Sequence, residues 1–437
     1  MKKSGEIMKK LMLGVGREII TPAIGGHLYG YNPDIISESV NDDLTVTAFY
    51  FEQDGKKALM LSICVCEINT DFCDKIRQLL EEKTGVNREN IMLCAIHTHS
   101  APNVAGTEGW GDIDMEYCDE IFVPKILEAA EKAVAETVGV KMRSAFGDSL
   151  VGVNRRQLFA NNRVDMGQNP WGPFNKKMTV LSFEDESGKC VANMIHYGCH
   201  GTAAGENKEI TRDWSGIMVD ALERKSGGIT AFFNGTIGDA GPRISNGKTV
   251  GNLSYVKELG DIAARDVLEI YEKISDSETP SFYIGSNILK IPVKPRESTE
   301  DCEKMYEKYK NETSNLGALI KDYLEKVMKL NSENAEQKDC FEISQQTVVL
   351  GDFVFTGIPF EIFAETGFRI DEAVKGKNVC CVSCCNGFEG YFATENELCR
   401  GGYEVKMFMY GRPQRFYDDA DWYLFKGMSD EVNSLFD

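Results

Sequence analysis

The feature that most constrains the fold is an alternation of short apolar strands and amphipathic helices along the 437 residues. Residues 44–52 and 58–65 are rich in β-branched and aromatic side chains and flank a Gln-Asp-Gly-Lys turn, a pattern typical of a β-hairpin. A helix is predicted next, with Asn69 or Thr70 as its N-cap and Gly85 as its C-terminal stop. Alternation of this kind favours an α/β fold.

The same signals predict the remaining elements. Further strands are expected over 91–96, 179–183, 191–197, 229–233 and 379–385, a hairpin over 347–358, and helices over 124–137, 253–271 and 360–373. Residues 297–338 are charged, poor in glycine and helical in period. We therefore expect mixed β-sheets flanked by helices in a single large domain over 13–437, with a helical insertion at about 297–338 and no separate C-terminal domain.

The net charge excludes some classes of partner. The chain carries 68 acidic and 48 basic residues, a net charge of −20, and has no dense block of lysine or arginine. Nucleic acid and anionic membrane surfaces both require a basic face, so neither is an expected partner. We interpret the acidity as a contribution to solubility. No apolar run is long enough for a transmembrane helix.

The cysteines indicate a reducing compartment. The start of the chain has lysines but no apolar stretch typical of a secretion signal, so the 14 cysteines are interpreted as free thiols and the protein as cytoplasmic. The run 380–385 contains a Cys-x-x-Cys, but the second pair that a zinc ribbon needs is missing.

Four of the five histidines fall in two close pairs, His97/His99 and His196/His200. His97 and His99 follow strand 91–96, where α/β folds place their chemistry, and a strand would present both imidazoles on one face. Zinc is commonly held by two or three histidines and a carboxylate, with one position left for water. For His196 an ordinary buried side chain is the alternative, whereas His200 lies in a His-Gly-Thr loop that favours a functional role.

A few charged residues stand out by their surroundings. Glu361 has apolar neighbours on both sides, and a buried carboxylate must be paired or bound to a metal. The alternative is an exposed glutamate in the first turn of the helix predicted over 360–373. Arg155 and Arg156 are either site residues or surface charges, and Asp239 is either a turn residue or a site residue.

Eight motifs occur in one order along the chain. They are Gly14-Val-Gly-Arg-Glu-Ile-Ile-Thr-Pro, Gly30-Tyr31, His97-Thr-His-Ser, Val153-Asn-Arg155, His200-Gly-Thr, Gly238-Asp-Ala-Gly-Pro, Gly-Ile-Pro-Phe-Glu361 and Gly390-Tyr-Phe-Ala-Thr. In this order they resemble the catalytic domain of the neutral/alkaline, non-lysosomal ceramidase family, over about residues 13 to 415.

The resemblance implies one catalytic zinc ion per chain and hydrolysis of an N-acyl amide bond. It implies four zinc ligands: His97, His200, Glu361 and Tyr391. It implies that His99 handles the proton of the zinc-bound water and that Arg155 positions His99. It also implies that Tyr403 is the tyrosine that stabilises the oxyanion.

The chain departs from the family in places that concern lipid specificity more than the metal. Ser-Ala-Pro-Asn follows His99, Trp-Ser-Gly-Ile follows Asp213, and the family's C-terminal immunoglobulin-like domain is not expected here. The substrate is a small-molecule or lipid-like amide, and we expect ceramide itself to be cleaved poorly. The alternatives are a hydrolase of small non-ceramide amides, esters or lactones, and a metal-binding homologue without turnover. A homo-oligomer is compatible with all of these.

Overall fold

The computed structural model describes residues 10–436. Residues 1–9 and 437 lie outside the described residues. The interpretation that the start of the chain lacks a secretion signal concerns residues outside this range. The last residue of the predicted domain also lies outside it. Within 10–436, no helix is both long and apolar enough to span a membrane.

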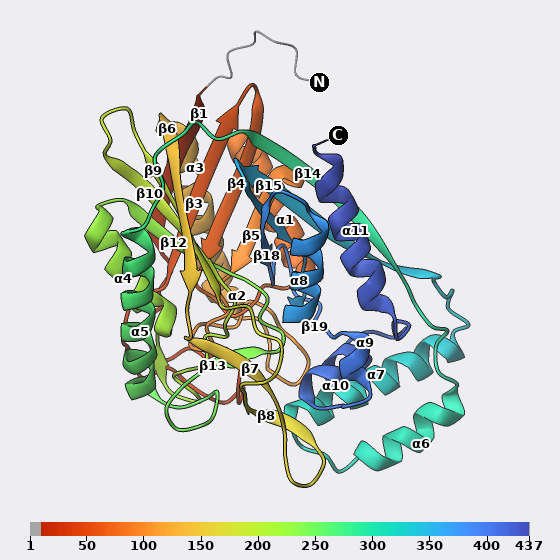
Figure 1. The fold of residues 1–437 in the computed structure, drawn as a ribbon. Helices are drawn as coiled ribbons and strands as arrows, with labels where there is room; N and C mark the ends of the chain where they lie inside the picture. Colours follow the sequence, from red (N-terminus) through yellow and green to blue (C-terminus); the bar gives the residue numbers. More distant parts are fainter. Residues whose placement is uncertain (1–9, 437) are drawn as a thin grey trace.

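Eight strands form the larger of two main sheets, in the order β12-β10-β9-β6-β1-β3-β4-β5 (Figure 1). They are β1 Leu11–Ile19, β3 Thr45–Gln53, β4 Lys56–Ile63, β5 Ile91–Ala95, β6 Thr137–Asp148, β9 Lys177–Glu184, β10 Cys190–Tyr197 and β12 Ile229–Asn234. The two outermost pairs, β4 with β5 and β10 with β12, are parallel, and the pairs between them are antiparallel. The sheet is therefore mixed.

A second sheet of four strands packs against the first. Its strands are β14 Phe282–Pro292, β15 Cys340–Leu350, β16 Phe353–Gly357 and β18 Asn378–Val382. Phe49 and Phe51 of β3 join Phe355 of β16 in the buried cluster between the sheets. Ala48 and Tyr50, the alternate residues of β3, belong to the cluster on the opposite face, as the period of two in a strand requires.

Helices cover the outer face of each sheet and complete four layers. Over the large sheet lie α1 Thr70–Thr84, α3 Val123–Ala135, α4 Trp214–Ser226 and α5 Leu253–Tyr271. Over the small sheet lie α8 Ala364–Ala373 and α11 Ala420–Ser434, whereas α10 Tyr403–Tyr410 lies below it beside α7 Asn315–Ser332 and β19 Tyr391–Phe392 (Figure 1). Shorter helices are α2 Met115–Tyr117 and α9 Glu395–Leu398. The predicted fold class, mixed sheets flanked by helices, is confirmed.

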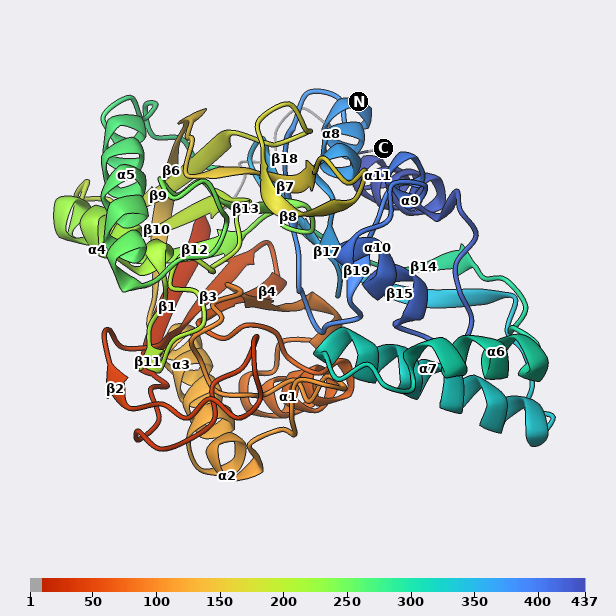
Figure 2. The ribbon, with the colours of Figure 1, turned by 90° about the horizontal axis from the view of Figure 1, so that it is seen from below.

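The charged segment 297–338 contains two helices, α6 Thr299–Tyr309 and α7 Asn315–Ser332. They pack on each other around Cys302, Ile320 and Leu324 and project from one side of the molecule (Figure 2). The start of α7 turns back toward the body, where Asn315 Nδ2 donates to the backbone carbonyl of Tyr31 at 2.8 Å. The segment therefore reaches the region where the polar strand ends meet.

The helix predicted over 360–373 begins later than expected. Residues Glu361–Ile362 form a short strand, β17, which pairs in parallel with β19, Tyr391–Phe392, and α8 begins only at Ala364. The expected start is wrong because the backbone N–H of Glu361 donates to the carbonyl of Gly390 at 2.9 Å, which holds the segment extended. The alternative of an exposed first-turn Glu361 is also wrong, since the side chain is buried.

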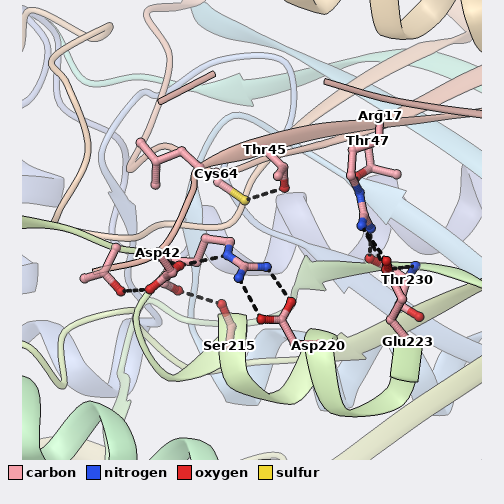
Figure 3. Close-up of polar contacts among 12 residues, drawn as sticks. Arg17, Asp42, Thr45, Thr47, Cys64, Ser215, Asp220, Glu223 and Thr230 are labelled. Carbon is pink, nitrogen blue, oxygen red and sulfur yellow. Dashed lines mark hydrogen bonds and ion pairs between the residues drawn. The ribbon is translucent and has the colours of Figure 1, made fainter. Parts of the chain in front are cut away.

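Two arginines fix α4 and the loop before it. Arg212 ion-pairs with Asp42 at 2.8 Å and with Asp220 of α4 at 2.9 Å. Arg17 of β1 pairs with Glu223, near the end of α4, at 2.8 Å; Figure 3 shows both networks. Because α4 begins directly after this loop, these contacts anchor the chain on the C-terminal side of His200.

All 14 cysteines are free thiols in the structure, and only Cys399 is exposed. Cys340 is partly exposed, and the others are buried. They serve mainly as small apolar side chains of the sheets and helices.

Candidate metal centre

Loops that follow strands β5 and β10 bring the two histidine motifs together. His97 follows β5, and His200 follows β10. The backbone N–H of Gly201 donates to the carbonyl of His97 at 3.2 Å, and that of His99 donates to the carbonyl of Gly201 at 3.1 Å. A Cβ atom at Gly201 would lie 2.8 Å from the His97 carbonyl oxygen, so only glycine allows this approach.

The imidazoles of His97 and His99 meet, but not because they share the face of a strand. β5 ends at Ala95, and His97 has a φ of 66°, in the left-handed region. The predicted strand geometry is therefore wrong. The loop nevertheless brings Nε2 of His97 to 3.3 Å from Nε2 of His99. A positive φ at a non-glycine residue such as His97 strains the backbone, and such strain is common in functional sites.

His97, His200 and Glu361 form a buried cluster whose candidate ligand atoms all lie within 4.8 Å of one another. Glu361 Oε1 is 3.4 Å from His97 Nε2, and Glu361 Oε2 is 3.1 Å from His200 Nε2. Nδ1 of His97 contacts the Cys66 carbonyl at 2.8 Å, and Nδ1 of His200 contacts the Ala240 carbonyl at 2.9 Å. Since a carbonyl only accepts, each Nδ1 carries the proton and each Nε2 presents a lone pair to the centre.

This donor set fits a metal ion. His200 Nε2 and Glu361 Oε2 are buried and have no hydrogen-bond partner among the described residues. Burial lowers the pKa of both His97 and His200 well below the usual value, which keeps the imidazoles neutral, and it raises the pKa of Glu361. Acceptors crowded together without a donor are costly, and a cation among them satisfies all of them at once. Two imidazole nitrogens and a carboxylate are typical zinc ligands.

A second group, Cys66 with His97 and His99, has the same spacing. Cys66 Sγ lies 3.7 Å from Nδ1 of His97, and that nitrogen already donates to the Cys66 carbonyl, so it has no lone pair to offer an ion beside the sulfur. We therefore place the candidate metal centre at His97, His200 and Glu361.

Tyr391 borders the centre because β17 and β19 pair it directly with Glu361. Its hydroxyl oxygen accepts a hydrogen bond from Nη2 of Arg155 at 2.9 Å. Arg155 lies on β7, Gly152–Leu158, and its Nε donates to Glu404 Oε1 at 2.7 Å. Burial raises the pKa of Tyr391 well above its usual value, and the Arg155 charge acts in the opposite direction. The strand pairing and the guanidinium together hold the phenol oxygen beside the carboxylate.

His99 and Tyr403 lie around the same centre. Nδ1 of His99 contacts the carbonyl of Gly30 at 3.1 Å, so its Nε2 is free to accept a proton. Gly30 is required here, because its φ is 115° and a Cβ would lie 2.4 Å from His99 Nδ1. Burial lowers the pKa of His99 to about 3. The ring of Tyr403 lies 5.7 Å from that of Tyr391.

The structure thus brings all seven residues predicted for the site together, and their roles remain predictions. His196 and Asp239 take other positions. His196 Nε2 contacts the Cys381 carbonyl at 2.8 Å, and its ring packs on Phe355, away from the centre. Asp239 accepts from the backbone N–H of Ala364 at 2.8 Å and so braces the segment that follows Glu361.

Two cavities border the centre and share His99, Tyr391 and Tyr403 in their lining; we call the larger the outer cavity and the smaller the inner cavity. The outer one, of about 590 Å³, is lined by His99, His200, Tyr391 and Tyr403 together with the start of α7. The inner one, of about 30 Å³, is bordered by His97, Glu361 and Tyr403 and also by residues that the sequence did not point to, above all Glu67 and Trp110. The only available signal for Glu67 was a carboxylate directly after an apolar run, the same signal that singled out Glu361.

These features define a four-layer α/β domain with a buried His-His-Glu cluster at the ends of its strands. No protein-family model matches the chain. Neutral ceramidase A of Dictyostelium discoideum is 25% identical over 255 residues, which cover 53% of this chain but only 35% of that protein. The match thus spans about a third of the length of that relative.

Solved structures match almost the whole chain. Neutral ceramidase from Pseudomonas aeruginosa superposes with a TM-score of 0.75 at 20% identity, covering 98% of this chain and 74% of the other. A ceramidase complexed with C2 gives a TM-score of 0.72 at 19% identity, covering 98% and 75%. The chain therefore has a neutral ceramidase-like fold, which confirms the resemblance inferred from its motifs at the level of the fold.

Proposed function

We propose that the protein is a zinc-dependent hydrolase that cleaves N-acyl amide bonds. The observation that carries this proposal is the convergence of His97 Nε2, His200 Nε2 and the Glu361 carboxylate, of which His200 Nε2 and Glu361 Oε2 lack a hydrogen-bond partner among residues 10–436. The likeness to neutral ceramidases supports amide hydrolysis as the reaction class.

The metal ion and the chain have separate tasks. A zinc ion bound by His97, His200, Glu361 and Tyr391 supplies Lewis-acid chemistry, lowering the pKa of water and polarising a carbonyl. Tyr391 is oriented for this set by Arg155, whose guanidinium donates to its hydroxyl oxygen at 2.9 Å. The cationic guanidinium also favours the phenolate form, which is the form that binds a metal.

His99 handles the proton in this proposal. Its Nδ1 is held by the Gly30 carbonyl, so Nε2 is the atom that accepts a proton from the attacking water and returns it to the leaving amine. Burial lowers the pKa of His99, so its imidazole is neutral near neutral pH and the Nε2 lone pair is available for the proton. The neighbouring hydroxyl of Tyr403 donates to the oxyanion as the carbonyl becomes tetrahedral.

The test combines metal content with hydrolysis. Purified protein should carry about one zinc ion per chain, lose hydrolysis of short N-acyl amides on chelation, and regain it when zinc is added back. The variant His200→Ala should contain little zinc, whereas Glu223→Gln, a change at the Arg17 contact, serves as the control with full zinc. Active wild-type protein without bound transition metal would refute the proposal. Long-chain ceramide belongs in the same panel, where we expect it to be a poorer substrate than short amides.

A further inference from the structure

Glu67 is a buried carboxylate at the inner cavity that the proposed reaction does not use. It is 4% exposed, and both of its hydrogen bonds reach one oxygen. Oε1 accepts from the hydroxyl of Tyr29 and, at 2.8 Å, from the hydroxyl of Thr107. No bond to Oε2 is found among residues 10–436. One carboxylate oxygen therefore remains for a group that enters the cavity.

Aromatic rings surround the rest of this cavity. Tyr29, Trp110 and Phe388 border it together with Tyr391 and Tyr403 of the candidate centre. Aromatic faces attract a cation through their quadrupole, and a carboxylate adds a hydrogen bond and a full negative charge. An alkyl chain would leave Oε2 of Glu67 without a hydrogen-bond partner, because Tyr29 and Thr107 both bond to Oε1. The lining therefore selects a positively charged donor.

The size of the inner cavity limits that donor to a small group. Its volume of about 30 Å³ has room for one group the size of a water molecule. A primary ammonium fits, whereas a long acyl chain must lie in the outer cavity of about 590 Å³. Because His97 and Glu361 border the same inner cavity, its occupant lies next to the amide that reacts.

We propose that Glu67 and the aromatic rings around it bind a primary ammonium group of the substrate, close to the scissile amide. The inference rests on the proposed function and narrows its substrate class to amides with a free cationic amine. That amine belongs either to the acyl part, as in an aminoacyl amide, or to the amine part, as in an acylated diamine. Burial raises the pKa of Glu67 to about 8, so in the empty cavity its carboxyl is mostly protonated at neutral pH, and a bound ammonium shifts it to the ionised form.

The charge of the rest of the molecule also favours a cationic substrate. The net charge of −20 produces a field that draws cations toward the protein, and Glu206 lines the outer cavity through which a substrate reaches the centre. Arg155, which also lines that cavity, is already paired with Glu404. Glu206 in the outer cavity therefore attracts a cationic substrate, and Arg155 in the same lining is neutralised by its partner.

Two pairs of isosteric amides test the proposal and separate the two sources of the amine. Glycyl-4-nitroanilide is compared with propionyl-4-nitroanilide, and N-acetylethylenediamine with N-propylacetamide. In each pair a terminal ammonium replaces a methyl group. With zinc-loaded wild-type protein, the ammonium member of one pair should have the higher kcat/KM by about 10- to 100-fold, as expected for a charge-assisted hydrogen bond. The pair that shows the preference tells whether the ammonium belongs to the acyl part or to the amine part of the substrate.

Glu67→Gln replaces the acceptor Oε2 with an amide of the same shape and should reduce that preference to about 1 to 3-fold. The matched control Glu223→Gln, whose carboxylate pairs with Arg17 instead, should keep the wild-type preference. Melting temperature and zinc content are measured for both variants, and a Glu67→Gln protein that fails to fold leaves the wild-type comparison as the deciding result. Equal kcat/KM values within both pairs would overturn the inference, as would a preference that Glu67→Gln leaves intact.

Failure of the proposed function gives a different result. If the zinc-loaded wild type cleaves none of the four amides, amide hydrolysis is refuted, and binding of the same compounds, measured by ligand-observed NMR, decides on Glu67. Tighter binding of an ammonium compound that Glu67→Gln abolishes supports the ammonium site, and equal binding of all four overturns it.

Discussion

Replacement of Glu404 by alanine should destabilise the protein strongly, because its carboxylate is buried between two arginines. Its carboxylate accepts from Arg155 Nε at 2.7 Å and from Arg156 Nη1 at 2.7 Å, and all three side chains are buried. Arg156 keeps a second carboxylate partner, Glu397, at 2.8 Å. Among residues 10–436, Arg155 then keeps only the hydroxyl oxygen of Tyr391 as a hydrogen-bond acceptor for its side chain.

The magnitude follows from the uncompensated charge. Removal of one partner from a buried ion pair costs about 3 to 5 kcal/mol. With an unfolding entropy of about 2.1 cal/mol/K per residue over 437 residues, Glu404→Ala should lower Tm by about 3 to 5 °C. Since Arg155 orients Tyr391, the variant should also bind zinc more weakly than the wild type.

Differential scanning calorimetry and zinc analysis measure the two effects. Asp261→Ala, which breaks the exposed pair with Lys257, is the control and should leave Tm and zinc content unchanged. The double variant Arg155→Ala, Glu404→Ala should lose less stability than the sum of the two single variants, because the unpaired charge is gone. A Glu404→Ala protein with the same Tm as the Asp261→Ala control would refute the reasoning.

The other predictions concern single side chains. Tyr391→Phe should lower zinc affinity and activity together, whereas Tyr403→Phe should keep its zinc and lose about 10²–10³ in kcat. If both variants have the zinc content and kcat of the wild type, neither tyrosine belongs to the site. Burial lowers the pKa of His196 from 6.5 to about 4, so between these values the unfolded chain binds the extra proton and stability falls on acidification, by about 1.4 kcal/mol per pH unit. His196→Gln should flatten this part of the dependence, as measured by Tm at pH 7 and pH 5, and an unchanged slope would contradict it. In native protein without reductant, the exposed Cys399 should react first with a thiol reagent and the buried cysteines only after unfolding; a shortage of thiols after unfolding would reveal disulfides.

The layers of the fold could be predicted because they depend on local patterns. The helix that begins after Asn69 has the capping side chain that the sequence signals, since Asn69 accepts from the backbone N–H of Phe72, and it ends at Gly85 with a positive φ. The expected helix over 253–271 coincides with α5, Leu253–Tyr271, because its apolar residues recur with helical spacing.

The segment around Glu361 shows where local patterns are insufficient. Its own sequence favours an early helix start, but pairing with Tyr391 imposes a strand, and that partner is distant along the chain. The turn at His97 is likewise set by contact with Gly201, not by the residues beside it. Tertiary contacts override local propensity in both places.

The candidate centre was partly predictable for a related reason. Histidines are scarce, so two close pairs stand out, and the order of the motifs carries the rest of the set. Glu404 has no such signal, and Glu67 has only its place after an apolar run, because each acquires its role from residues far away in sequence. Glu67 meets Tyr29 and Thr107, and Glu404 meets Arg155, only in the folded chain.

The location of the metal ion tests the central claim most directly. Crystals of protein purified without chelators are measured on both sides of the zinc absorption edge, and an anomalous difference map is calculated. We predict a single strong zinc peak per chain, within bonding distance of His97 Nε2, His200 Nε2 and the Glu361 carboxylate. Zinc-replete, active protein whose peak lies elsewhere, for example among the cysteines of 380–385, would contradict the account.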